Sequence, residues 1–160
     1  MPGPYADLSH RFAFDERMLA VAVEGFTDAT WRARPAPDVG NSAHWVLAHL
    51  AATRRQLARR LGAALPTAPW EASVARGAPA GEVHGATPAA LVDDLRATGV
   101  EVRARLDALT PDEAAAPFGR TLPDGSTTVI DAARFVQLHE AYHLGQLGLL
   151  RRLHGLPGFA

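Results

Sequence analysis

Apolar side chains recur every three or four residues over most of the chain, which is the period of one face of an α-helix. The pattern predicts four long helices, over about residues 7–26, 41–62, 88–109 and 129–154. No segment shows the sustained alternation of apolar and polar residues that a half-buried β-strand needs. The sequence therefore predicts an all-α protein, and we expect its four helices to form a bundle.

Residues that favour helix ends lie at the expected boundaries. Asn41 or Ser42 caps the start of the second helix, and Thr87 followed by Pro88 opens the third. Gly155 follows the last helix, where glycine commonly ends a helix because it tolerates a left-handed backbone. These positions support the helix boundaries that the apolar period predicts.

Two long connectors rich in proline and glycine separate the later helices. The first, over about residues 63–86, carries Trp70, which we expect to anchor it to the bundle. Connectors of that length commonly form functional lids or mobile segments. The second, over residues 117–128, contains a Pro-Asp-Gly turn signal and predicts a small hairpin or an irregular loop.

The motif HEAYHLGQ in the last predicted helix places His139 and His143 four residues apart. Side chains at this spacing stack one turn apart on the same helix face, so both imidazoles can reach one metal ion. Stepping along the helix by threes and fours puts them in line with Ala132, Val136 and Leu147, which belong to its apolar stripe. The two histidines are therefore predicted to face the core.

A third ligand is expected from another helix, because zinc sites commonly have at least three protein ligands. His49 is the best candidate, since it lies in the middle of the second helix at the edge of its apolar stripe. His44 is weaker, because it lies about 140° round that helix from His49 and cannot face the same ion. The remaining histidines are less promising: His10, His84 and His154.

Two further residues are candidates for the surroundings of this site. Gln146 shares the face of His139 and His143 and could orient a ligand, a water or a substrate, or make a plain helix-packing hydrogen bond. Trp45 lies one turn before His49 and could form the wall of a pocket, although a core aromatic residue needs no such role.

Composition limits the remaining classes of function. The chain of 160 residues has a net charge of −1 and no cysteine, so nucleic-acid binding and a cysteine nucleophile are not expected. We interpret its one basic cluster, Arg54, Arg55, Arg59 and Arg60, as a solvated helix face. No apolar segment is long enough to cross a membrane, and no leader pattern is evident, so we expect one soluble, cytoplasmic domain over residues 1–160.

HEAYH also matches the HExxH motif of zinc peptidases, in which Glu140 would be the general base. The extended form of that motif needs a glycine and a third histidine where this chain has Gln146 and Leu149. No acidic residue follows Glu140, so the variant with a downstream glutamate is also excluded. A di-iron carboxylate site would need a second Glu-x-x-His, which the chain lacks.

The sequence resembles the DinB/YfiT-like superfamily of metal-binding four-helix bundles in two segments. NSAHWVLAHLAA, residues 41–52, is similar to the second-helix signature of that family and maps its first metal histidine to His49. HEAYHLGQLGLLRRLHGLPG, residues 139–158, is similar to the last-helix signature and maps the other two ligands to His139 and His143.

The resemblance implies up-down-down-up connectivity, a nickel or zinc ion held by three histidines, and in many members a homodimer. Some relatives are transferases or isomerases that use a low-molecular-weight thiol. We therefore expect a metal-dependent enzyme that activates such a thiol or, as the second choice, water in a hydrolase. A non-enzymatic metal- or small-ligand-binding stress protein and a bundle without metal stay open as alternatives.

Overall fold

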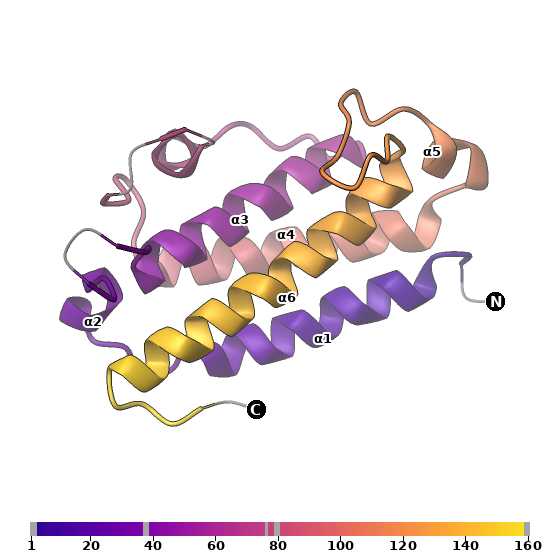
Figure 1. Cartoon of the computed structure of the whole chain (residues 1–160). Helices are drawn as coiled ribbons and strands as arrows, with labels where there is room; N and C mark the ends of the chain where they lie inside the picture. The colour runs from indigo at the N-terminus through magenta and orange to yellow at the C-terminus, as the bar shows by residue number, and fades with distance from the viewer. Residues whose placement is uncertain (1–2, 37–38, 76, 79–80, 159–160) are drawn as a thin grey trace.

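The computed structural model describes residues 3–36, 39–75, 77–78 and 81–158, and four long helices lie side by side in it (Figure 1). These long helices are α1 (Ala6–Ala22), α3 (Ala43–Arg60), α4 (Pro88–Ala108) and α6 (Val129–Leu153). Three short helices lie in the connections: α2 (Asp28–Arg32), the 3-10 helix η1 (Pro69–Val74) and α5 (Pro111–Ala115). The described residues form isolated bridges but no strand, which confirms the predicted all-α bundle.

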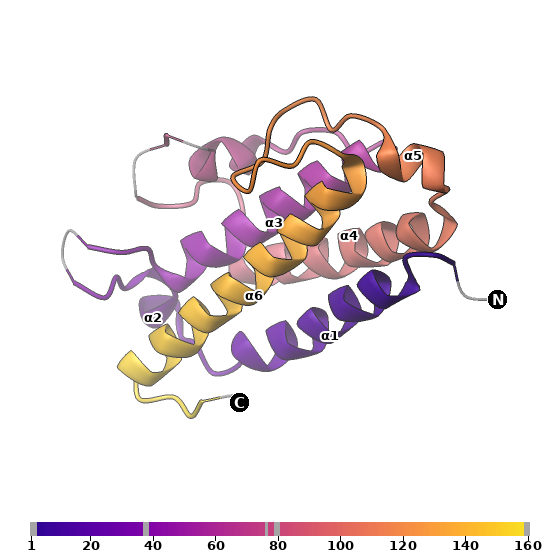
Figure 2. The ribbon, with the colours of Figure 1, turned by 45° about the vertical axis from the view of Figure 1, so that its right-hand side comes forward.

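Helices α1 and α6 run in one direction, and α3 and α4 run in the other (Figures 1 and 2). Hydrogen bonds between the helices agree with these directions. In two parallel helices, a bond farther along one helix also lies farther along the other. This holds for the bonds Asp15–Gln137 and Ala22–Arg151 between α1 and α6, and for Arg54–Leu95 and Leu61–Arg105 between α4 and α3 or its C-cap. The connectivity is therefore up-down-down-up, and a long connection carries the chain from the end of α3 back to the start of α4.

Predicted caps are found at the starts of two long helices. The Ser42 hydroxyl accepts a hydrogen bond from the backbone N–H of Trp45, and that of Thr87 accepts one from Ala90. Thr128 caps α6 in the same way. Each cap satisfies one of the backbone N–H groups that a helix start leaves without a partner, and stabilises the helix by about 1 kcal/mol.

The first predicted helix is wrong in its extent, because it ends four residues earlier than residue 26. Gly25 has a φ of 82°, a left-handed conformation in which the chain leaves the helix. Thr27 then starts α2 with a reciprocal pair of side-chain to backbone hydrogen bonds that it shares with Thr30. The short helix α5, which begins after Thr110, was also not predicted.

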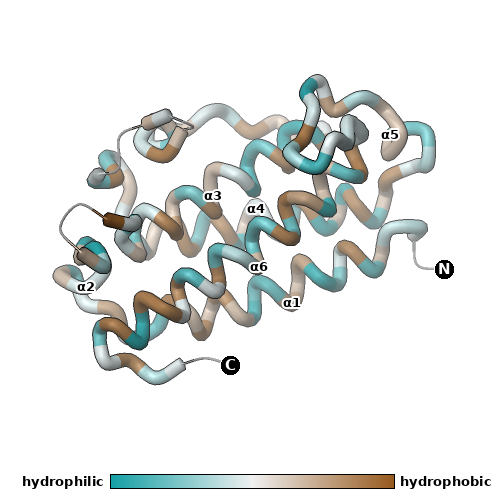
Figure 3. Tube along the Cα trace, in the orientation of Figure 1, coloured by the Kyte–Doolittle hydropathy of each residue, from teal (hydrophilic) through white to brown (hydrophobic). Residues whose placement is uncertain are grey.

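Buried residues of the four long helices form the core, and both hydrophobic and hydrophilic residues occur along each of these helices (Figure 3). The connector after α3 joins this core through η1, because Trp70 is buried and its ring lies under the guanidinium of Arg55 on α3. This confirms that Trp70 anchors the connector. The second connector is closed by a bridge between Pro117 and Thr128, as expected for a small hairpin-like loop. No helix in the described residues is long and apolar enough to cross a membrane.

The prediction that the basic cluster forms a solvated face is wrong for two of its arginines. Arg54 is only 2% exposed, and its guanidinium forms two hydrogen bonds with the carboxylate of Glu140, at 2.8 and 2.5 Å. Arg55 is buried and is paired with Glu71 of η1. Because acidic side chains from other elements neutralise both groups, their burial is tolerated. Only Arg60 of the cluster is classed as exposed.

Asp15 of α1 lies close to this ionic core. Its carboxylate is buried and accepts a hydrogen bond from the Gln137 side chain at 3.0 Å. Burial, reinforced by the negative charge of Glu140, raises the pKa of Asp15 from 3.8 to about 6, although Gln137 and two arginines oppose the shift. The ionised form of Asp15 is therefore disfavoured in the folded protein.

We expect Asp15→Asn to remove part of the pH dependence of stability. Because the folded-state pKa of Asp15 lies above its unfolded value, its stabilising contribution is complete below pH 3.8 and is lost as the pH rises through about 6. The variant should therefore gain about 1–3 kcal/mol relative to the parent between pH 4 and pH 7. Urea unfolding of the metal-free proteins across this range measures the difference. The exposed Asp93→Asn is the control, and parallel profiles for parent and Asp15→Asn would contradict the prediction.

Candidate metal centre

Three histidines from two helices meet at the seam between α3 and α6. His49 comes from α3, and His139 and His143 come from successive turns of α6. The Nε2 atom of His139 lies 3.0 Å from Nε2 of His49 and 3.0 Å from Nε2 of His143. One imidazole nitrogen from each of the three histidines lies within 4.8 Å of the other two. Among the described residues, this group could hold a metal ion. The structure thus brings together the three predicted ligands.

Hydrogen bonding among the three rings does not satisfy this arrangement. Each imidazole nitrogen carries either one hydrogen or one lone pair in the ring plane, so it takes part in one such bond. The Nε2 atom of His139 has two imidazole nitrogens at 3.0 Å and can satisfy only one of them. A shared cation accepts a lone pair from every ring at once. The donor set therefore fits a divalent metal ion better than a histidine cluster linked by hydrogen bonds.

Burial keeps the three imidazoles in the neutral form that binds metals. Desolvation, together with the neighbouring histidines, lowers the pKa of His139 from 6.5 to about 3. Desolvation also lowers the pKa of His143 to about 4 and lowers the pKa of His49. At neutral pH the lone pairs of these rings are therefore free of protons, and no proton has to be displaced when a cation binds.

Gln146 orients one of the ligand histidines. Its Oε1 atom accepts a hydrogen bond of 2.7 Å from Nδ1 of His143, and its Nε2 atom donates to the hydroxyl of Tyr142 at 3.1 Å. Because the proton of His143 is held on Nδ1, its lone pair is on Nε2, which faces the other two rings. The sequence left open whether Gln146 orients a group at the site or makes a plain helix-packing hydrogen bond, and in the structure its Oε1 atom binds a histidine of the cluster.

Aromatic side chains surround the three imidazoles. Trp45 stacks on His49, with ring centroids 4.9 Å apart and an angle of 15° between the planes. The ring of Tyr142 contacts that of His143 edge to face, with ring centroids 5.0 Å apart. The ring centroids of Phe135 and His139 are 6.3 Å apart. Trp45 therefore packs on one histidine of the cluster, and Tyr142 and Phe135 lie beside the other two.

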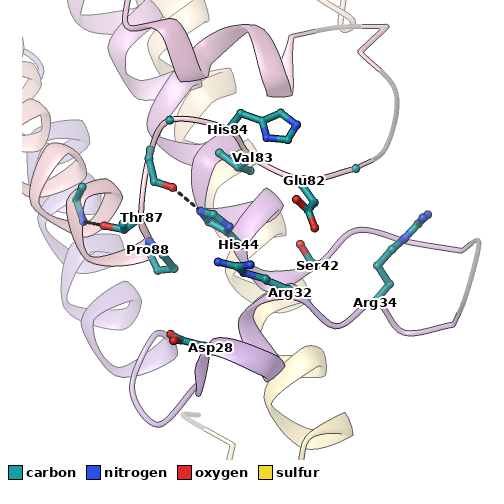
Figure 4. Close-up of a pocket in the computed structure, with 14 residues that line it drawn as sticks. Asp28, Arg32, Arg34, Ser42, His44, Glu82, Val83, His84, Thr87 and Pro88 are labelled. Atoms are coloured by element: carbon teal, nitrogen blue, oxygen red, sulfur yellow. Dashed lines mark hydrogen bonds between the residues drawn. The ribbon is translucent and has the colours of Figure 1, made fainter.

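His44 lies outside this cluster, as its position on the helix predicted. Its Nε2–H donates to the carbonyl of Ala86 at 3.0 Å, and its ring lines a separate pocket of about 890 Å³ beside α2 (Figure 4). The lining of this pocket carries both signs of charge, for example Arg32 and Glu82. Burial lowers the pKa of His44, so it is a neutral histidine bonded to the backbone.

Glu140 has a structural role instead of the role of a general base. It is 1% exposed, and both of its carboxylate oxygens are bonded to Arg54. Because both oxygens already accept hydrogen bonds from a buried guanidinium, the carboxylate is engaged in an ion pair within the core. The HEAYH segment therefore supplies two histidines of the cluster and a carboxylate held by Arg54, which argues against the peptidase interpretation of its glutamate.

The sequence profile of the DinB superfamily matches residues 11–147. The chain belongs to the DinB superfamily. The matched range covers most of the four-helix bundle and includes all three histidines of the cluster together with Gln146. A search of curated proteins finds no match to the chain. The resemblance of residues 41–52 and 139–158 to the signatures of this family is thereby confirmed at the level of family membership.

In this DinB-superfamily protein we expect Gln146→Leu to weaken zinc binding about 10- to 100-fold, which is the usual effect of removing the partner of a ligand histidine. The leucine fills a similar volume but cannot accept the Nδ1–H of His143, so the ring loses its fixed orientation. Competition with a chromophoric chelator measures the affinity. Tyr142→Phe is the matched control, because it removes only the outer hydrogen bond to Gln146. Equal zinc affinities for Gln146→Leu and the parent would contradict this role.

Proposed function

We propose that this protein binds one divalent metal ion, nickel or zinc, through His49, His139 and His143, and that it is an enzyme of the S-transferase type acting with a low-molecular-weight thiol. The observation that carries the proposal is the meeting of three neutral imidazoles, in which the Nε2 atom of His139 faces two others at 3.0 Å. Hydrogen bonds cannot satisfy that geometry, whereas a shared cation can.

A divalent ion held there would deprotonate a coordinated thiol and would bring the pKa of a coordinated water to about 7. The side chains of the chain itself prepare the site for this chemistry. Gln146 fixes the protonation of the His143 ring, and Trp45 packs flat on the His49 ring. Three protein ligands leave room at a metal for a further ligand from outside, as in catalytic sites.

Two features favour a thiol over water as the activated group. The carboxylate of Glu140, which could have served as a general base for water, is bonded to Arg54. The chain contains no cysteine, so no thiolate of its own competes for the metal. Metal-assisted hydrolysis is the second choice. The substrate is a small molecule in either case, and the homodimer expected from the resemblance stays a prediction.

We expect purified, tag-free protein to contain about one equivalent of nickel or zinc per chain when no chelator is used, because three protein ligands are usual for such an ion. Mass spectrometry measures the metal content. His49→Ala and His143→Ala should each lose most of the metal, whereas His44→Ala, which removes a histidine of the same helix outside the cluster, should keep it. Metal-free parent protein that gains no thermal stability from added nickel or zinc would refute the proposal.

We also expect a cellular thiol to become a ligand of the metal. In cobalt-substituted protein, addition of the thiol should produce a thiolate-to-cobalt charge-transfer band, and the thiol should titrate at a lower pH than it does in water. Absorption spectroscopy follows both changes, and the corresponding alcohol is the control. Cobalt protein that binds metal but shows no such band would favour hydrolysis. If the cobalt protein also catalyses neither thiol transfer nor ester hydrolysis, the results would favour a non-enzymatic metal-binding protein.

A further inference from the structure

A second pocket, of about 450 Å³, lies at the carboxyl end of α3 beneath the connector that leads to α6. Its lining consists of one amide, one phenyl ring and three guanidinium groups: Gln56, Phe118, Arg59, Arg60 and Arg120. No carboxylate belongs to this lining, in contrast to the larger pocket beside α2, which contains Asp28 and Glu82. The pocket at the end of α3 is therefore cationic.

Two of these arginines are held in place without an acidic partner. The guanidinium of Arg60 lies 5.3 Å from the centre of the Phe118 ring, and that of Arg120 lies 5.6 Å from it. Within the described part of the chain neither forms an ion pair, whereas Arg59 of the same pocket is paired with Glu71. Both guanidinium groups lie over the same ring and neither is neutralised by an acidic side chain in the described residues, so an anion that contacts them would supply the missing counter-charge.

The backbone of the connector allows this approach. Gly119 stands between Phe118 and Arg120 and has a φ of 90°, a conformation that other residues rarely adopt. A Cβ atom at Gly119 would lie 3.4 Å from Nη1 of Arg60. The glycine thus permits the turn that brings Phe118 and Arg120 over the end of α3, next to the side chain of Arg60.

The cationic pocket lies on the same side of α3 as the histidine cluster. Arg60 follows His49 by eleven residues, which corresponds to about 16 Å along the helix and a rotation of only about 20°. Phe135 of α6 links the two sites. Its ring lies beside that of His139, and it packs against the small hydrophobic cluster that contains Phe118. The histidine cluster and the cationic pocket are therefore the two ends of one seam between α3 and α6.

We propose that Arg60 and Arg120 bind the carboxylate or phosphate group of a substrate or thiol whose reactive end lies at the histidine cluster. This inference rests on the proposed function, because the reactive end needs the metal. The Cα atoms of His49 and Arg60 lie about 16 Å apart along α3. The molecule recognised is thus extended, with an anionic group on the order of 16 Å from the atom that meets the metal.

Cobalt-loaded protein and a series of linear ω-mercaptocarboxylates test the inference. The thiol-to-cobalt band reports binding, and ω-mercaptoalcohols of equal length are the uncharged references. We expect mercaptoundecanoate to bind about tenfold more tightly than its alcohol, as the gain of a charge-assisted hydrogen bond implies. Mercaptopropionate, which is too short to reach the arginines, should show no such preference. Alkyl thiols that end in phosphate form a second series, which distinguishes the two anions by their relative affinity.

The double variant Arg60→Gln and Arg120→Gln should abolish the preference for the long carboxylate while it keeps its cobalt content and its affinity for the alcohols. Arg17→Gln is the matched control, because Arg17 is also an exposed arginine that lies over a phenyl ring, that of Phe14 on α1. A preference that survives in the double variant, or a parent that binds acids and alcohols equally, would overturn the inference and leave the proposed function intact. Failure of the parent to bind cobalt would instead refute the proposed function, and this inference with it.

Discussion

The buried ion pair between Arg54 and Glu140 is the interaction on which the site depends. It joins α3 to α6 inside the bundle, and Glu140 is the residue directly after His139 of the histidine cluster. Because both charges are buried, removal of either partner would leave an unpaired charge in the core, at a cost of about 3–5 kcal/mol. The pair therefore restrains the rotation of α6 against α3, which is the variable that decides whether His139 and His143 face His49.

Charges and aromatic rings are distributed unevenly around that seam. Acidic side chains neutralise the arginines that lie inside the bundle, so Arg54 and Arg55 act as structural residues. The imidazoles sit among aromatic rings that keep them neutral by desolvation. Arg60 and Arg120, at the far end of the seam, have no acidic partner in the described residues. The arginines inside the bundle are thus structural, whereas the arginines for which we propose ligand binding lie at its surface.

Local signals were sufficient for the three later long helices, but they missed the end of α1 and the short helices. The caps Ser42 and Thr87 bind backbone N–H groups three residues later, and such a cap can be read from neighbouring residues alone. Helices of five residues such as α2 are too short to show an apolar period, although the Thr27 and Thr30 pair carried a capping signal. The break at Gly25 was missed because the apolar pattern continues across it to Phe26.

The sequence by itself determined the helical class, the ends of the three later long helices and the common face of His139 and His143 on α6, because spacing along one helix fixes which side chains share a face. It also favoured His49 over His44 by the angle between them on α3. Only the tertiary structure decided which arginines are buried, that Glu140 is bound to Arg54, and that Gln146 holds His143. For Arg54 and Glu140 the partners are 86 residues apart in the chain, so no local pattern could reveal them. Such contacts arise from how the helices pack, and the packing also decides which charges remain free to bind a ligand.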